Sequence, residues 1–258
     1  MRGVETRIQG IRHSIFTEIA RMAYETDGYV GKRIEELPYE IIPGEIGKFR
    51  NDVFLERAIV GERLRLAMGL PCRGAGEHAP LSDNIELADQ TETYYTPPLI
   101  NVIKFACNAC AEKRVFVTDG CQGCLAHPCV EVCPKNAVTL DRTNGRSYID
   151  PEKCIKCGKC AEVCGYNAII VQERPCAAAC GMDAIHSDEN GKADIDYDRC
   201  VSCGQCLVNC PFGAISDKSQ IFQVIRAIRS GERVYAALAP AFVGQFGPKV
   251  TPGKLRAA

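Results

Sequence analysis

Cysteine is concentrated in one part of this 258-residue chain. Of its 17 cysteines, only Cys72 lies outside the segment from Cys107 to Cys210, which therefore holds the other sixteen. Sixteen thiols can supply ligands in four groups of four. That number suits four cubane iron–sulfur clusters and, by arithmetic alone, four zinc ions equally well. The spacing of the cysteines has to distinguish the two metals.

Three segments of this region have the cysteine spacing of bacterial ferredoxins. In that pattern, three closely spaced thiolates hold one 4Fe-4S cluster, and the fourth cysteine serves the other cluster of a pair. Two runs match the pattern fully, Cys154–Cys164 and Cys200–Pro211, and a third, Cys121–Pro134, has two inserted residues. Zinc sites usually take their ligands from two separated pairs instead. The three runs therefore predict iron–sulfur clusters.

An internal repeat organises the remaining cysteines. Four of them are followed by three residues, then an alanine and a β-branched residue: Cys133, Cys164, Cys180 and Cys210. Alternating segments around Asn-Gly pairs at 144–145 and 190–191 predict two β-hairpins, each of which leads the chain into a full cysteine run. The sequence thus predicts two ferredoxin-like units in tandem.

The second unit lacks its first two cysteines. Ile169–Gln172 stands where that pair would be expected, and it contains no thiol. The one pair left over, Cys107 and Cys110, lies upstream of the first unit. It can complete the second unit if the chain loops back, so that the first unit is inserted between the halves of a split motif.

In each pair of clusters, the fourth cysteine of one motif is expected to bind the cluster of the other motif. This rule gives four expected ligand sets. Site 1 is expected to use Cys121, Cys124, Cys129 and Cys164, and site 2 is expected to use Cys154, Cys157, Cys160 and Cys133. Site 3 is expected to use Cys200, Cys203, Cys206 and Cys180, and site 4 is expected to use Cys107, Cys110, Cys176 and Cys210. For site 4 an alternative stays open. Cys107 and Cys110 could form a zinc ribbon with Cys121 and Cys124, because two C-x2-C pairs ten residues apart also suit zinc.

The rest of the chain predicts two further regions. Residues 1–96 are expected to be helical, with an apolar stripe from Ile8 to Met22 and a second helix from about Gly44 to Leu70. Residues 97–218 form the expected four-cluster domain. Residues 219–258 are expected to begin a third domain, with a helix at Ser219–Ser230, a buried strand at Val234–Leu238 and a helix that starts at Pro252.

Composition excludes several classes of function. The chain carries 31 Lys+Arg and 32 Asp+Glu, a net charge of −1, so no overall field recruits nucleic acid or an anionic membrane. No segment approaches the ~18 consecutive apolar residues of a membrane span. The first residues do not form a secretory signal, and many metal-bound thiolates suit a reducing compartment. We therefore expect a cytoplasmic protein.

Together these motifs resemble a known family. Asn101–Ile215, followed by Arg233–Gly247, is similar to the N-terminal part of FeFe hydrogenases, above all the clostridial-type monomeric enzymes of group B. The resemblance implies an α+β fold: a helical N-terminal region, tandem 2x(4Fe-4S) ferredoxin-like units, and the start of an α/β catalytic domain. It also implies that Ala239, Pro240 and Ala241 lie against the active-site cluster, as cofactor-binding residues.

The resemblance also implies what these residues lack. The family's catalytic Cys-Cys-Pro and Met-Pro-Cys motifs do not occur here, so no catalytic residue is expected, and the chain is interpreted as a fragment or a truncated form. The expected function is the electron-transfer module of an FeFe hydrogenase. It would relay single electrons between a soluble ferredoxin-type carrier and a hydrogen-activating diiron H-cluster, which only a full-length parent, a ferredoxin-dependent hydrogenase, would hold.

Two alternatives belong to other classes of protein. One is an iron–sulfur electron-transfer subunit of another redox complex, such as a molybdopterin oxidoreductase. The other is a zinc-bound structural or interaction protein. Among single residues, Cys72 is interpreted as a thiol that holds no metal, and His127, inside the first run, as a residue near a cluster rather than a ligand.

Overall fold

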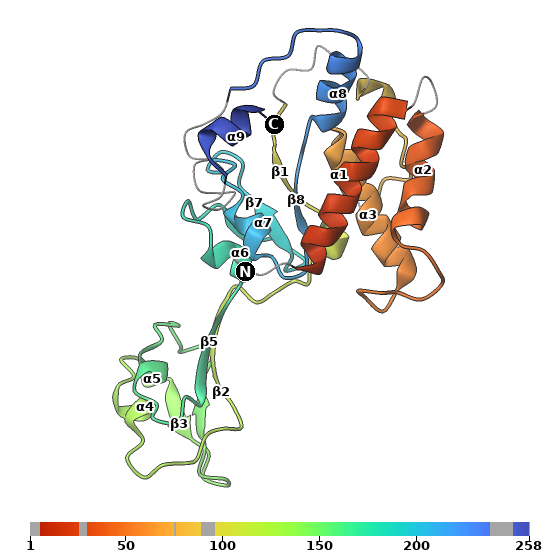
Figure 1. Ribbon diagram of the computed structural model, residues 1–258. Coiled ribbons are helices and arrows are strands. Elements are labelled where there is room, and N and C mark those ends of the chain that lie inside the picture. Colours follow the sequence, from red (N-terminus) through yellow and green to blue (C-terminus); the bar gives the residue numbers. More distant parts are fainter. Residues whose placement is uncertain (1–5, 26–29, 75, 89–95, 238–249, 258) are drawn as a thin grey trace.

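The computed structural model describes residues 6–25, 30–74, 76–88, 96–237 and 250–257. The described helices are α1 (Arg7–Glu25), α2 (Val30–Ile41), α3 (Val53–Ala67), α4 (Pro128–Glu131), α5 (Lys159–Glu162), α6 (Pro175–Ala178), α7 (Gln205–Asn209), α8 (Ile221–Arg229) and α9 (Pro252–Ala257). The strands are β1 (Ile100–Val102), β2 (Lys113–Val117), β3 (Val138–Leu140), β4 (Ser147–Ile149), β5 (Ile169–Glu173), β6 (Ile185–Ser187), β7 (Ala193–Ile195) and β8 (Ile215–Asp217). Two short 3₁₀ turns, η1 (Ile85–Leu87) and η2 (Lys104–Ala106), complete the elements, which Figure 1 shows in place.

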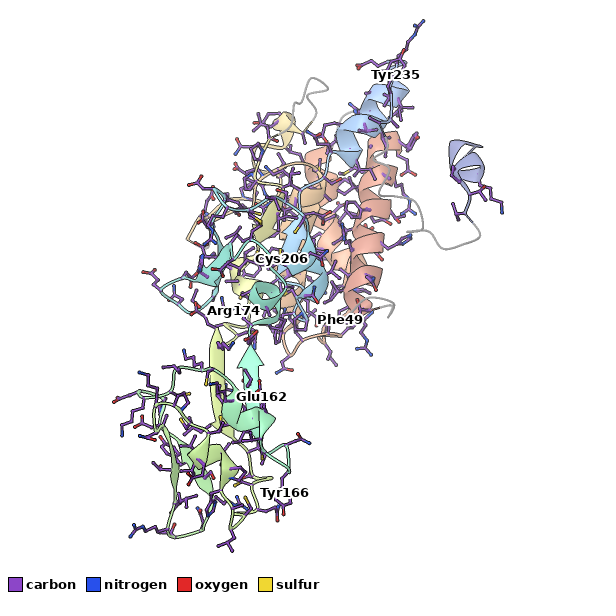
Figure 2. All side chains as sticks on the ribbon, turned by 90° about the vertical axis from the view of Figure 1, so that its left-hand side faces the viewer. Phe49, Glu162, Tyr166, Arg174, Cys206 and Tyr235 are labelled. Atoms are coloured by element: carbon purple, nitrogen blue, oxygen red, sulfur yellow. The ribbon has the colours of Figure 1, made fainter. Side chains whose placement is uncertain are left out.

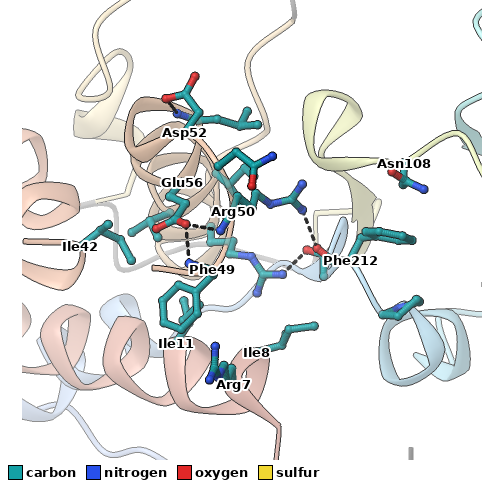
Figure 3. Close-up of a pocket in the computed structure, with 17 residues that line it drawn as sticks. Arg7, Ile8, Ile11, Ile42, Phe49, Arg50, Asp52, Glu56, Asn108 and Phe212 are labelled. Atoms are coloured by element: carbon teal, nitrogen blue, oxygen red, sulfur yellow. Dashed lines mark hydrogen bonds between the residues drawn. The ribbon is translucent and has the colours of Figure 1, made fainter. Parts of the chain in front are cut away.

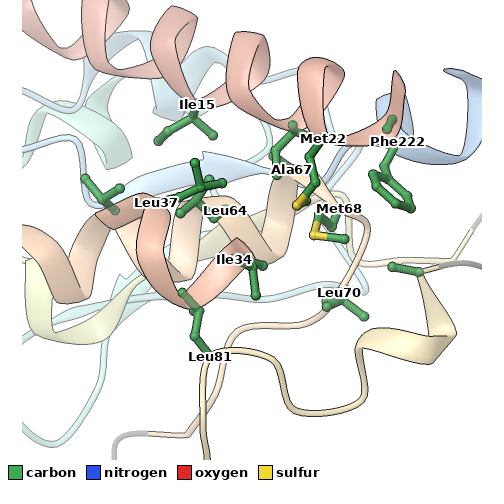
Figure 4. Close-up of a cluster of buried hydrophobic side chains, with 14 of the residues drawn as sticks. Ile15, Met22, Ile34, Leu37, Leu64, Ala67, Met68, Leu70, Leu81 and Phe222 are labelled. Carbon is green, nitrogen blue, oxygen red and sulfur yellow. The ribbon is translucent and has the colours of Figure 1, made fainter. Parts of the chain in front are cut away.

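The long helices α1, α2, α3 and α8 form one helical unit. The apolar stripe of α1 is buried at Ile15, Ile19 and Met22, as the sequence predicts. Helix α8 follows the cluster segment in the chain but packs back against α1, and its Phe222 is fully buried in the same apolar core (Figure 4). The helical N-terminal region is therefore closed by a helix from the other side of the cluster segment.

Helix α3 begins later than the sequence predicts. The expected helix from about Gly44 to Leu70 starts only at Val53, because the Asp52 carboxylate caps it by accepting hydrogen bonds from the N–H groups of Phe54 and Leu55. The preceding residues form bends, and α2 has no counterpart in the prediction. Pro38 lies inside α2, and proline in a sequence usually marks a helix end.

Two ferredoxin-like units follow with the same strand order. We call the unit that contains β1, β6, β7 and β8 the upper unit, and the unit that contains β2 to β5 the lower unit, after their places in Figure 1. In the upper unit β1 pairs with β8 and β6 pairs with β7. In the lower unit β2 pairs with β5 and β3 pairs with β4, and all four pairs are antiparallel. Both predicted hairpins are confirmed. Gly145 and Gly191 adopt positive φ values of 71° and 70° in the two turns, which explains the Asn-Gly pairs.

The lower unit is inserted into the upper one through a two-stranded ribbon. Strand β2 leaves the upper unit and β5 returns to it, paired from Lys113 with Glu173 to Val117 with Ile169. Figure 1 shows the ribbon joining two separate lobes, with the helical unit on the upper lobe. The chain therefore loops back between Cys110 and Cys176, as the split motif requires.

The C-terminal part corrects one prediction. Helix α8 is present, but the described residues 232–237 contain no strand, so the strand expected at Val234–Leu238 is wrong over 234–237. The expected cofactor-binding residues Ala239, Pro240 and Ala241 lie outside the described residues. The first strand of a catalytic domain is thus not among the described elements. No helix in the described ranges has the length and apolar character needed to cross a membrane.

Candidate iron–sulfur cluster sites

The third cysteine of each expected set lies in a one-turn helix. These cysteines are the second residues of α4, α5, α6 and α7, namely Cys129, Cys160, Cys176 and Cys206. Each is almost fully buried, with 6%, 6%, 6% and 8% of its surface exposed. One local structure therefore occurs four times, although one of the four motifs is split in sequence.

The repeat after the fourth cysteine of each motif has a direct structural cause. Three residues beyond it, the backbone adopts a left-handed conformation with φ between 49° and 59°, at Asn136, Asn167, Asp183 and Gly213. Asparagine, aspartate and glycine tolerate this conformation better than other residues. The turn brings the next N–H group back toward the cysteine.

That N–H group belongs to the repeated alanine and donates to sulfur. The four bonds join Ala137 to Cys133 at 3.2 Å, and Ala168 to Cys164, Ala184 to Cys180 and Ala214 to Cys210 at 3.4 Å each. The four alanines are 1–2% exposed, so a larger side chain has no room. An N–H directed at sulfur stabilises a thiolate, which is the form that binds metal.

The first two cysteines of each motif share a second turn. The residue just before the second cysteine has φ between 48° and 58° in all four loops, at Ala109, Gly123, Lys156 and Ser202. The pair Cys107 and Cys110 therefore has the same loop conformation as the three complete runs. Its Cys107 sulfur also accepts a hydrogen bond of 3.3 Å from the N–H of Ala193 in the upper hairpin.

Two of the expected ligand sets each surround one cavity. The four cysteines of site 2 line a small cavity of about 20 Å³ next to Val115 of the ribbon. The four cysteines of site 4 line a small cavity of about 20 Å³ together with Arg174 and Phe212. The structure thus brings the two halves of the split motif together, although 65 residues separate Cys110 from Cys176 in the sequence (176 − 110 − 1).

The cysteines of sites 1 and 3 are described by their contacts with neighbouring residues. In site 1, the Cys129 sulfur lies 3.3 Å from the Ser147 hydroxyl, and Cys164 packs against the same apolar cluster. The backbone N–H of Ser147 is the main cause that lowers the pKa of Cys121. In site 3, Cys206 is buried in one cluster with Cys180 and Cys200. Cys124 is half-buried, and Cys203 is exposed.

Thiol acidity follows burial and hydrogen bonding. Burial would raise the pKa of Cys133, but backbone N–H groups, led by those of Lys135 and Ala137, lower it below its usual value. Burial dominates at Cys176 and Cys206 and raises the pKa of each to about 11. Those two thiols would lose their protons only to a bound metal.

The metal-ligating side chains stand apart from one another within the described residues. In the described part of the chain, no three His, Cys, Asp or Glu side chains are close enough together to hold one metal ion. In a 4Fe-4S cluster each thiolate binds a different iron, so the sulfurs stand farther apart. The five-residue strand β2 lies between the pair Cys107 and Cys110 and the pair Cys121 and Cys124, so a zinc ribbon would have to join the two pairs across that strand. A five-residue strand spans about 17 Å.

Cys72 and His127 belong to none of the four expected cysteine sets. Cys72 packs against the core of the upper unit, and burial raises the pKa of its thiol to about 12, so it stays protonated at neutral pH. The Nδ1 atom of His127 is buried and has no hydrogen-bond partner among the described residues. His127 comes two residues before Cys129 of site 1 and opens helix α4.

The helical unit is anchored to site 4 by arginines. Arg50 Nη2 donates to the carbonyl oxygens of Phe212 at 2.9 Å and Ala106 at 3.2 Å, and Arg63 Nη2 donates to that of Gly213. Arg50, Arg63, Phe212 and Gly213 border a groove between α1, α3 and the loop after Cys210 (Figure 3). Sequence patterns did not reveal these contacts, because arginine side chains usually face solvent.

Comparisons with known proteins agree with this geometry. Residues 147–170 match the family of 4Fe-4S binding domains, and residues 171–221 match that of the LdpA Fe-S cluster-binding domain. An uncharacterized ferredoxin of Methanocaldococcus jannaschii is 40% identical over 67 residues, which are 24% of this chain and 43% of that protein. The polyferredoxin-like subunit of an aliphatic sulfonate oxidoreductase from Pyrococcus furiosus is 43% identical over 50 residues, 19% of this chain and 29% of that protein.

A smaller relative is covered more completely. A ferredoxin of Alicyclobacillus acidocaldarius is 42% identical over 57 residues, which are 22% of this chain and 70% of the ferredoxin. The chain spans less than half the length of the other two relatives. None of these three relatives is named as a hydrogenase.

The repeated loops, the hydrogen bonds to sulfur and these matches define an iron–sulfur protein with 4Fe-4S domains. Through its cluster segment, the chain belongs to the ferredoxin family. It is an iron–sulfur electron-transfer module with a helical unit attached.

The left-handed turn after the fourth cysteine can be tested at Asn167, which is exposed and has φ 50°. Asn167→Val should lower the free energy of unfolding by about 1–2 kcal/mol, because a β-branched residue is strained in this conformation. Asn167→Gly is the matched control and should change it by a few tenths of a kcal/mol. Anaerobic urea denaturation followed by circular dichroism measures both. Equal stability of the two variants would contradict the role of the turn.

Proposed function

We propose that the chain holds four 4Fe-4S clusters, one at each of sites 1 to 4, with the crossed ligand sets predicted from the sequence. The observation that carries this proposal is the fourfold repeat of the same two left-handed turns and the same alanine N–H bond to sulfur. Site 4 repeats them in full, although its cysteines come from two distant segments. The cavities at sites 2 and 4 give further support.

A bound 4Fe-4S cluster supplies one-electron chemistry, at a potential set by its ligands, hydrogen bonds and burial. The residues of this chain tune these properties. The alanine N–H groups stabilise thiolate charge, and burial of Cys129, Cys160, Cys176 and Cys206 limits access of water to the ligands. No catalytic residue is proposed. A reducing, cytoplasmic setting suits sixteen metal-binding thiols.

Two parents are proposed for the module. The first is an FeFe hydrogenase, on the sequence resemblance of Asn101–Ile215 and Arg233–Gly247. In such a parent Ala239–Ala241 would border the diiron H-cluster, and ligands from beyond this sequence would hold that cluster. The second is another redox complex, and the likeness to the polyferredoxin-like subunit of a sulfonate oxidoreductase supports it equally.

The electron carrier is proposed to dock at the lower unit beside site 2. Four exposed lysines flank the cysteines of this site in the sequence, and Lys135 and Lys159 line its cavity: Lys135, Lys153, Lys156 and Lys159. The equivalent positions of site 3 hold Met182, Arg199, Ser202 and Gln205, with one positive charge among them. Cys157 and Ile155 are also exposed within the lysine rim. Positive charge around an exposed cluster loop suits an acidic one-electron carrier, such as a soluble ferredoxin.

Metal content tests the fourth site. The reconstituted chain should contain about sixteen iron and sixteen sulfide per molecule and no zinc, as four cubanes require. The double variant Cys107→Ser/Cys110→Ser should retain about twelve iron, because one cubane is lost. Cys72→Ser is the control and should retain the full iron content. Anaerobic iron, sulfide and zinc analysis measures all three. About twelve iron with one zinc in the unmodified chain would show that site 4 is a zinc site.

The lysine rim predicts salt-dependent docking. Lys156 and Lys159 form no ion pair with another described residue, so Lys156→Gln/Lys159→Gln should leave the fold intact. The variant should accept electrons from a reduced acidic ferredoxin about tenfold more slowly at low ionic strength, and the difference should vanish in high salt. Stopped-flow absorbance measures the rate.

The control removes the same charge elsewhere. Lys32→Gln/Lys48→Gln changes two exposed lysines of the helical unit. It should leave the rate unchanged. A slower rate in both variants would point to overall charge, not to a docking face at site 2.

A further inference from the structure

A buried arginine stands at the junction of the two units. Arg174 follows β5 directly and opens helix α6, two residues before Cys176. Only 2% of its surface is exposed. Figure 2 shows it where the ribbon meets the upper unit. Arg174 lines the cavity of site 4 together with the four cysteines of that site.

The hydrogen bonds of Arg174 all go to neutral acceptors. Nε and Nη2 donate to the Cys110 carbonyl at 2.9 and 2.6 Å, and Nη1 donates to the His186 carbonyl at 3.0 Å. Nη2 also donates to the Ser187 hydroxyl and the Gly191 carbonyl, both at 2.8 Å. The guanidinium therefore links the loop of Cys110 to the upper hairpin, but these bonds bring no negative charge to it.

Acidic side chains near Arg174 do not neutralise it. None of the ion pairs found among the described residues includes Arg174. Glu112 interacts electrostatically with Arg174, but its carboxylate lies at the surface. This carboxylate accepts its hydrogen bond from the N–H of Ser187, at 2.9 Å. A buried cation without an anion is strongly unfavourable in a protein interior. The four cysteine thiols of site 4 line the same cavity. They would supply the missing negative charge once they bind a cluster as thiolates.

The other three sites have no such cation at this position. Two residues before the third cysteine they place His127, Gly158 and Gly204, all in left-handed turns with φ of 41°, 82° and 74°. Arg174 has an extended backbone, φ −65° and ψ 118°, because it leaves strand β5. The split of the fourth motif is what puts a long side chain here. A second buried arginine, Arg63, contacts the Gly213 carbonyl beside Cys210 and adds positive charge to the same site.

From this geometry we propose that Arg174 is the buried counter-charge of site 4 and gives it the highest reduction potential of the four sites. The inference rests on the proposed function, because it requires a cluster at site 4. Reduction adds negative charge to the site, and a fixed cation nearby stabilises the reduced form more than the oxidised form. Arg174 is a positioning residue as well, since it joins the Cys110 loop to the hairpin.

Substitution separates charge from positioning. Arg174→Gln removes the charge, whereas Arg174→Lys keeps the charge but loses most of the five hydrogen bonds. An anaerobic redox titration followed by EPR should show the first-reduced cluster shifted to more negative potential in Arg174→Gln, so that it is no longer reduced first. In Arg174→Lys the same cluster should still be the first to be reduced. Equal negative shifts in both variants would overturn the proposal, because they would show that only the packing matters.

A second measurement decides the matter if Arg174→Gln does not fold. In otherwise unmodified protein, Cys110→Ser changes a ligand of site 4, and Cys157→Ser changes a ligand of site 2 as the matched control. The EPR signal that appears first on reduction should change in Cys110→Ser and stay unchanged in Cys157→Ser. The opposite pattern, with full iron content in the unmodified protein, would overturn the role of Arg174. An iron content of about twelve instead of about sixteen in the unmodified protein would instead contradict the presence of the fourth cluster.

Discussion

The cluster segment depends on backbone N–H groups directed at cysteine sulfur. A left-handed residue turns the chain after the fourth cysteine of each motif, and the following alanine then donates to that sulfur. The same alanine is buried, and the β-branched residue after it starts the next strand or leads into it. One short segment thus supplies the ligand, its hydrogen bond and the core of the small unit. Little apolar core is needed elsewhere, which explains sheets of only two strands each.

The second constraint is the ribbon of β2 and β5. It carries the lower unit away from the helical unit and still keeps the halves of site 4 together, because its antiparallel pairing returns the chain to its starting point. Site 2 lies against Val115 on the ribbon, and site 4 lies where the ribbon enters the upper unit. The ribbon therefore joins two units that would each resemble a separate ferredoxin.

Spacing along the chain is what allowed the four ligand sets to be proposed from the sequence. The reach of a thiolate is local, so the runs that end at Cys164 and Cys210 could be recognised without a structure, and the missing pair pointed to Cys107 and Cys110. The long-range contacts could not be predicted in this way. Nothing in the sequence around Arg174 or Arg63 shows that each is buried against a backbone carbonyl, because arginine is usually exposed.

Element boundaries were harder to predict. The cap at Asp52 was missed, so α3 was expected to begin too early, and the apolar residues at 234–237 were interpreted as a strand, although they pair with no described strand. A strand needs a partner, and a single sequence does not say where that partner is. By contrast, the Asn-Gly hairpins needed only local turn chemistry, and both are present.

Anaerobic diffraction at the iron and zinc absorption edges tests the central claim most directly. Four iron peaks are expected, two in each unit, with one of them enclosed by Cys107, Cys110, Cys176 and Cys210. Three iron peaks and a zinc peak at Cys107 and Cys110 would contradict it. So would an iron peak that joins Cys107 and Cys110 to Cys121 and Cys124 at one site.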